Sequence, residues 1–232
     1  MALFDTMKSP SSAKTLGPVN LQDQIRRQIE ADIASGLMQP GGLIEEKKYA
    51  EFFNTSRTPI REALIVLSER GLVDIVPRTG IYVRKLQASE LVAMMEALGE
   101  LEGVLARLAA RRIGSLQRAG LLQALENTSG QERAGDIDGY QVANASLHEL
   151  IYQTSGNAFI VEQARAVRLR IAAYRSRMFE KPGRLTASQR EHERIVHAIL
   201  AGDANEAAEA MRDHISAGGR VFADLILENF PN

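Results

Sequence analysis

The sequence contains no cysteine and no tryptophan, and only 5% of its 232 residues are aromatic. Without cysteine there can be no disulfide, thiolate zinc site or iron–sulfur cluster, so a metal would need His, Asn, Asp or Glu ligands. No uninterrupted apolar run approaches the roughly 18 residues of a membrane helix, and the N-terminus lacks a cationic stretch followed by an apolar core. We therefore expect a cytoplasmic protein with no membrane partner. With 45% hydrophobic and 25% charged residues, the chain can bury a core in one large domain or two small ones.

The charge is nearly balanced but unevenly distributed. The 28 basic and 29 acidic side chains give a net charge of −1. Residues 1–86 carry +2, however, and residues 87–232 carry −3. Phosphate binding depends on a local basic surface rather than on total charge. The overall charge therefore does not exclude nucleic-acid binding by the N-terminal part.

The N-terminal third has the element order of a winged helix-turn-helix. Residues 1–18 are rich in Ser, Lys, Pro and Gly and predict a disordered arm. Apolar residues recur every four positions from Leu21 and predict a helix that stops at Gly36. A second helix is predicted over 45–53 and a third from Arg57 to Gly71, followed by a hairpin with strands 72–76 and 81–83. These patterns predict a winged helix-turn-helix domain over residues 19–86.

Three segments carry a family resemblance: residues 50–64 (AEFFNTSRTPIREAL), 67–73 (LSERGLV) and 80–83 (GIYV). Together they resemble the DNA-binding module of the GntR family of bacterial transcription regulators. The resemblance implies double-stranded operator DNA as the partner. It also implies a homodimer that reads a two-fold symmetric site.

The third predicted helix supplies the expected base readers, because a helix-turn-helix places the N-terminal end of this helix in the major groove. The fork of an Arg side chain matches the two acceptors of guanine, and Ser and Thr suit phosphate oxygens. The resemblance adds a lysine that touches phosphate and a wing tip whose glycine allows backbone to approach the minor groove. Alternatively, the two arginines of the helix only form a solvated surface. The predicted DNA-binding residues are Lys47, Ser56, Arg57, Thr58, Arg61, Arg78 and Gly80.

The remainder of the chain predicts an all-α antiparallel bundle over residues 87–232, which makes the fold class mainly α. Apolar spacing predicts helices over 89–113, 116–127, 137–154, 158–179, 188–201 and 204–228. Capping patterns at Ser188-x-x-Glu191 and Asp203-x-x-Glu206 support the last two starts. Leu86-Gln87 is the expected linker, where a small hinge change would alter the spacing of two DNA-binding domains.

Three histidines lie on the apolar stripes of different predicted helices: His148, His192 and His214. A lone buried histidine is typically a hydrogen-bonded core residue. Three of them would each need a partner, whereas one divalent cation satisfies all three. The pattern therefore predicts a metal site, with Zn as the expected ion and Ni or Mn as alternatives because imidazole suits several metals. His197 falls off the stripe, and we expect Glu149 and Glu191 to point away from the site.

The histidine order is similar to that of the ligand-binding domain of the FadR subgroup of GntR regulators, in particular its VanR-like branch. This resemblance implies Asn144 as a fourth ligand, where relatives usually have Asp, and a small organic acid as effector. This sequence departs from the family at Leu98, where many relatives have an Arg that helps to hold the acid. The alternative for Asn144 is an ordinary surface position.

An ion held by neutral imidazoles and an amide keeps its charge and suits a carboxylate. Arg168 and Arg175 share a predicted helix face around Tyr174 and could clamp a second acidic group. Alternatively, they face solvent or a dimer partner.

These features favour a DNA-binding repressor that a small organic acid releases from its operator. The alternative is a metal-dependent hydrolytic enzyme, since three histidines and an open position also make a hydrolytic zinc site. The sequence has no H-E-x-x-H, no G-x-S-x-G and no phosphate-cradling glycine loop, so we predict no enzymatic activity. A third possibility is an architectural DNA binder without an effector.

Overall fold

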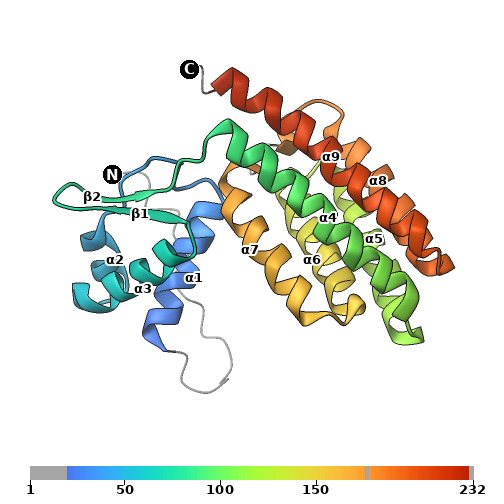
Figure 1. Cartoon of the computed structure of the whole chain (residues 1–232), viewed down its shortest axis with the longest axis horizontal. Coiled ribbons are helices and arrows are strands. Elements are labelled where there is room, and N and C mark those ends of the chain that lie inside the picture. The colour runs from blue at the N-terminus through green and yellow to red at the C-terminus, as the bar shows by residue number, and fades with distance from the viewer. Residues whose placement is uncertain (1–19, 176–177, 230–232) are drawn as a thin grey trace. The chain divides into compact units, whose positions relative to one another are not determined.

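The computed structural model describes residues 20–175 and 178–229, with side chains through residue 219. It divides into two compact units, Met1–Leu86 and Gln87–Asn232 (Figure 1). The predicted fold class is confirmed, since a small helical unit with a hairpin precedes an all-helical unit. The predicted disordered arm of residues 1–18 lies outside the described residues.

The N-terminal unit is a winged helix-turn-helix. It consists of α1 (Leu21–Ala34), α2 (Glu46–Phe52), α3 (Arg57–Glu69) and an antiparallel hairpin of β1 (Val73–Val76) and β2 (Gly80–Val83). Helix α1 packs on α3, and the apolar residues of both helices are buried: Ile25, Ile29, Ile33, Ile60, Leu64 and Leu67. Burial of such side chains contributes about 1.5–3 kcal/mol each, so this contact stabilises the position of α3 against α1.

A buried acid joins α1 to α2. Asp32 is only 5% exposed. It accepts hydrogen bonds from the Tyr49 hydroxyl at 2.5 Å and from the Gln28 amide at 2.8 Å. Burial, aided by Asp32, raises the pKa of Tyr49, so the phenol stays protonated and can donate. The pair therefore fixes α2, which carries Lys47, against α1.

The C-terminal unit is a helical bundle with α4 at its centre. The helices are α4 (Ala88–Arg112), α5 (Ser115–Ala134), α6 (Ile137–Ser155), α7 (Ala158–Arg175), α8 (Arg184–Ala201) and α9 (Ala204–Asn229), with a short 3₁₀ turn, η1 (Met178–Glu180), before α8. Helix α4 contacts α6, α7, α8 and α9, and runs beside α9 (Figure 1). Gly103 allows this approach, because a Cβ there would lie 3.1 Å from the Ala208 carbonyl oxygen.

Several predicted helix boundaries are wrong. Helix α5 continues to Ala134, past the predicted end at residue 127, and α7 ends at Arg175 instead of reaching residue 179. Helix α8 begins at Arg184. The residue before it, Gly183, has a left-handed φ of 76°, which interrupts helical geometry at that point. The predicted cap at Ser188 is therefore wrong, and Ser188 lies fully buried inside the helix.

The other predicted cap is present, since Asp203 Oδ1 accepts from the Glu206 amide at 3.0 Å. Across the described part of the chain, no helix combines the length and the hydrophobicity needed to cross a bilayer.

Candidate functional site

The predicted DNA-binding residues gather around two shallow surface hollows in the N-terminal unit. Lys47, Ser56 and Arg57 line the first hollow, at the turn between α2 and α3. Arg61, Arg78 and Gly80 line the second, between α3 and the hairpin. Thr58 is exposed in the first turn of α3 beside Arg57. The fold therefore brings residues from α2, α3 and the wing tip to open surface, where a duplex could reach them.

The two arginines of α3 differ in their surroundings. Within the described residues, the exposed Arg57 makes no hydrogen bond or ion pair. In contrast, Arg61 donates from Nε to Glu46 Oε2 at 2.8 Å. Glu46 stands in the first turn of α2 and was not predicted as part of the site. This pair orients the Arg61 side chain, whereas Arg57 has no such partner among the described residues.

Gly80 at the wing tip has a structural requirement of its own. Its φ is 147°, and a Cβ there would lie 2.8 Å from Leu43 Cδ1. Arg78, two residues earlier, also has a positive φ of 63°, which is uncommon for a residue with a side chain. The fold of the wing by itself therefore requires glycine at this position.

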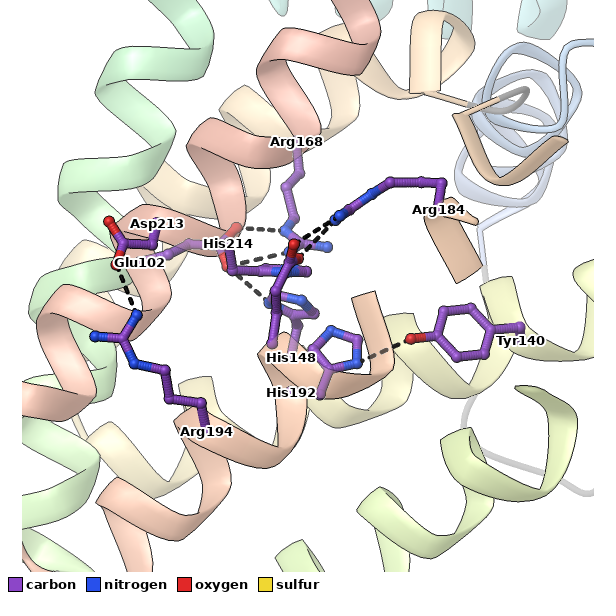
Figure 2. Close-up of polar contacts among 10 residues, drawn as sticks. Glu102, Tyr140, His148, Arg168, Arg184, His192, Arg194, Asp213 and His214 are labelled. Carbon is purple, nitrogen blue, oxygen red and sulfur yellow. Dashed lines mark hydrogen bonds and ion pairs between the residues drawn. The ribbon is translucent and has the colours of Figure 1, made fainter. Parts of the chain in front are cut away.

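The three predicted ligand histidines meet inside the C-terminal unit (Figure 2). His148 of α6, His192 of α8 and His214 of α9 are each at most 2% exposed. Ring nitrogens of the three residues lie within 4.8 Å of one another. Asn144, one turn before His148, is 6% exposed, so its alternative as a surface residue is wrong. His197 is exposed and apart from the cluster, as its position off the apolar stripe predicts.

Each histidine has a polar partner at Nδ1. His148 Nδ1 lies 2.7 Å from Glu102 Oε2, His214 Nδ1 lies 2.6 Å from Glu191 Oε2, and His192 Nδ1 lies 3.2 Å from the Tyr140 hydroxyl. These contacts turn the Nε2 atoms towards the shared centre. In His148 and His192, Nε2 is buried and has no hydrogen-bond partner. An acceptor at Nδ1 and a free Nε2 are typical of metal-binding histidines.

The expectation that Glu191 points away from the site is wrong. Neighbouring residues on a helix are about 100° apart, and α9 packs against α8 on the side to which Glu191 turns. It therefore meets His214 instead of solvent. Glu149 does point away, and its carboxylate pairs with Arg165 at the surface.

Two arginines hold the two carboxylates. Arg168 donates to Glu102 through Nε at 2.6 Å and through a terminal nitrogen at 3.1 Å. Arg184 donates to both oxygens of Glu191 at 2.7 Å. Although burial opposes ionisation, Arg168 and His148 keep the pKa of Glu102 well below its usual range. Hydrogen bonds from His214 and Arg184 likewise lower the pKa of Glu191 against the effect of burial. The site thus contains two Arg–Glu–His chains, defined as Arg168–Glu102–His148 and Arg184–Glu191–His214.

Burial keeps the imidazoles neutral. It lowers the pKa of His148 to about 3, with Arg168 adding to the effect. It also lowers the pKa of His192 and of His214. Neutral imidazole is the form that binds metal. Together with the unpaired, buried Oδ1 of Asn144, these donors fit one divalent cation.

Sequence reasoning missed Glu102 and Arg184. Glu102 is fully buried between Leu98 and Leu105 on the inner face of α4. A carboxylate on an otherwise apolar stripe is the signal that could have identified it, since such a group needs a charged partner. Arg184 gave no such signal, because the predicted helix began after it.

The predicted acid-binding residues have different environments. Arg168 is engaged by Glu102, so it is not an unoccupied cation. Arg175 and Tyr174 are half-buried near the end of α7. Burial and the neighbouring Arg168 lower the pKa of Arg175 to about 10, which leaves its guanidinium charged at neutral pH.

A winged helix-turn-helix unit followed by an all-helical unit is the architecture of a DNA-binding transcription regulator. Family comparison agrees. Residues 21–83 match the bacterial regulatory proteins of the gntR family, and residues 93–217 match the FCD domain family. The chain belongs to the GntR family of transcription regulators that carry an FCD domain. It is a DNA-binding regulator and not an enzyme, so the hydrolytic alternative is wrong.

Curated relatives are similar along most of the chain. One is the probable D-xylose utilization operon transcriptional repressor of Paenarthrobacter nicotinovorans, 27% identical over 89% of this chain and 91% of its own length. Another is the Escherichia coli repressor RspR, 28% identical over 85% of this chain and 86% of its own length. Among solved structures, E. coli McbR/YncC has a TM-score of 0.81 at 20% identity, covering 90% of this chain and 99% of its own. This last similarity supports the fold.

Proposed function

We propose that this regulator is a homodimeric repressor whose C-terminal domain holds a divalent metal ion and binds a small organic acid there. Zn is the expected ion. Asn144, His148, His192 and His214 would hold it, and the acid would lower the affinity of the dimer for a two-fold symmetric operator. Because its target is bacterial DNA, we place it in the cytoplasm.

The arrangement of the three imidazoles is the observation that carries this proposal. Their Nδ1 atoms are bonded to Glu102, Tyr140 and Glu191, while the buried Nε2 atoms of His148 and His192 lack partners. Leaving buried polar atoms unpaired costs about 1–3 kcal/mol each. A bound cation would remove this cost. Without a cation, turning the rings towards one another leaves these Nε2 atoms without a partner.

The carboxylates and arginines around the histidines would set the properties of the site. Glu102 and Glu191 fix the ring orientations and increase the basicity of the bound nitrogens. Arg168 and Arg184 hold these carboxylates ionised. When bound, the ion supplies a positive charge that attracts a carboxylate. Figure 2 also shows an ion pair between Arg194 and Asp213. This pair is exposed and has no role in the proposed site.

Regulation requires that the acid distinguish two states of the dimer. A ligand shifts an equilibrium only by its difference in affinity for the two states. The acid must therefore bind the DNA-free dimer more tightly than the operator-bound dimer, and by linkage DNA must weaken acid binding equally.

The test begins with a selection of genomic fragments on the purified protein, which identifies the operator. Metal content is then measured by mass spectrometry, and operator affinity by fluorescence anisotropy with and without candidate acids. We expect about one equivalent of divalent metal per chain, a two-fold symmetric operator, and at least one acid that weakens operator binding. Metal-free protein after purification and reconstitution would overturn the metal site. Operator affinity that no acid changes would overturn the effector role.

A further inference from the structure

Arg175 is the cation of the C-terminal site that has no counter-charge bonded to it. Among the residues that the structure describes, it donates no hydrogen bond and forms no ion pair. The guanidinium groups of Arg168 and Arg184 are each bonded to a glutamate. An unpaired guanidinium beside a buried site is costly unless an anion reaches it.

The position of Arg175 on α7 places it near the pair of Arg168 and Glu102. Arg168, Ile171 and Arg175 follow one another at three- and four-residue spacing and therefore share a helix face. Ile171 is fully buried, and the Arg168 guanidinium lies 5.8 Å from the centre of the Tyr152 ring. The charges that act on Arg175 include those of Arg168, Glu102 and Arg184. Its side chain thus lies within electrostatic reach of both Arg–Glu–His chains.

The charges of the site do not balance. Arg168 neutralises Glu102, Arg184 neutralises Glu191, and the imidazoles and Asn144 are uncharged. The charge of Arg175 and the two charges of a divalent ion then remain, with no anion among the described residues of the site to oppose them. An Asp at position 144 would cancel one of these charges. This chain has Asn, which leaves more positive charge for a ligand to neutralise.

From this imbalance we infer that the effector carries two anionic groups, one bound to the metal ion and the second to Arg175. This inference rests on the proposed function and makes it narrower. The second group is a carboxylate or a phosphate, since the fork of an Arg side chain binds either one through paired hydrogen bonds. A monocarboxylic acid would leave Arg175 without a partner.

Calorimetry on the full-length, metal-loaded protein tests this with two matched pairs of acids. L-malate is compared with 2-hydroxybutyrate, and 3-phosphoglycerate with glycerate. Within a pair, both acids carry the same carboxylate and neighbouring hydroxyl, so both can contact the ion equally. We expect the doubly anionic member of at least one pair to bind about tenfold or more tightly than its partner, a difference of about 1.4 kcal/mol. The pair that shows the preference identifies the second group.

Variants assign the preference to Arg175. Arg175→Gln should reduce the affinity for the doubly anionic acid to that for its partner and leave the partner's affinity unchanged. Arg165→Gln, on the same helix but paired with Glu149 at the surface, should change neither. Asn144→Asp should weaken binding of the doubly anionic acid more than binding of its partner. Metal content of each variant, measured in parallel, shows that the site is still assembled.

Each of the other outcomes contradicts one of the two claims. Equal affinities within both pairs, or a preference that survives Arg175→Gln, overturn the inference and leave the proposed function standing. If none of the four acids binds, the inference is overturned, and if in addition no other acid alters operator affinity, the proposed function itself fails.

Discussion

The two units of this protein use arginine in opposite ways. In the N-terminal unit, the predicted base readers are exposed, and Arg57 is free of any protein partner among the described residues. In the C-terminal unit, Arg168 and Arg184 are committed to buried carboxylates and act on the histidines through them. Exposed arginines can take their geometry from the DNA. Buried arginines need a counter-charge from the fold or from a ligand, because burying a charge without a partner is costly.

The largest effect is expected from removing one of the proposed metal ligands of the C-terminal unit. His192→Ala takes away a buried imidazole that faces the other two. Metal affinity should fall by more than the roughly 10- to 100-fold loss typical of an outer-shell partner. Measured by competition with a chromogenic chelator, the loss should be absent in His197→Ala, which removes an exposed histidine from the same helix. Equal losses in both variants would mean that the cluster does not bind the ion.

The second prediction concerns the Arg184–Glu191–His214 chain. Glu191→Gln keeps the shape of the side chain but removes the charge that Arg184 and His214 share. Metal affinity should fall about 10- to 100-fold, without loss of the operator sequence preference. Glu149→Gln is the matched control, because Glu149 is likewise adjacent in sequence to a histidine of the cluster but pairs with Arg165 at the surface. Unchanged metal affinity in Glu191→Gln would show that the Arg184–Glu191–His214 contacts stabilise the fold and do not affect metal binding.

The contrast between the two units also explains what the sequence could predict. The predicted DNA-binding surface comes from one continuous stretch. Its turn residues, Pro59 and the apolar period of α3 together predict a helix-turn-helix. The order of elements and the exposure of Arg57 were therefore predictable. Glu46 was not, since its contact with Arg61 depends on how α2 and α3 cross.

The histidine site combines residues far apart in the sequence. Periodicity placed His148, His192 and His214 on inward faces, because a buried stripe is a local property. It could not identify which neighbour each ring meets. Glu102 reaches His148 across 46 positions of the sequence, and Arg168 reaches Glu102 across 66. Glu191 was placed wrongly because the direction of a residue beside the stripe depends on the adjacent helix, here α9.

The third prediction concerns Arg57, the exposed arginine of the N-terminal unit that has no partner among the described residues. Arg57→Ala should weaken operator binding by about 1–3 kcal/mol and relax the preference for one base pair in each half-site. Metal content should stay unchanged, because Arg57 belongs to the other unit. Anisotropy titrations against operators with single base-pair changes measure both effects. An affinity loss that is equal for all operator variants would show that Arg57 contacts phosphate instead of a base.

The smallest effect is expected for Lys47, which lines the same hollow as Arg57. Its ammonium lies 3.6 Å from Glu51, and both side chains are exposed, so this surface pair contributes at most about 1 kcal/mol and can yield to a phosphate. Lys47→Ala should weaken binding to all operator variants by the same few-fold factor and reduce the slope of log affinity against log salt by about 1. Arg57→Ala and Lys47→Ala thus separate base reading from phosphate contact within one hollow. A change in base preference on loss of Lys47 would assign it to the groove, since a contact to the phosphate backbone carries no sequence information.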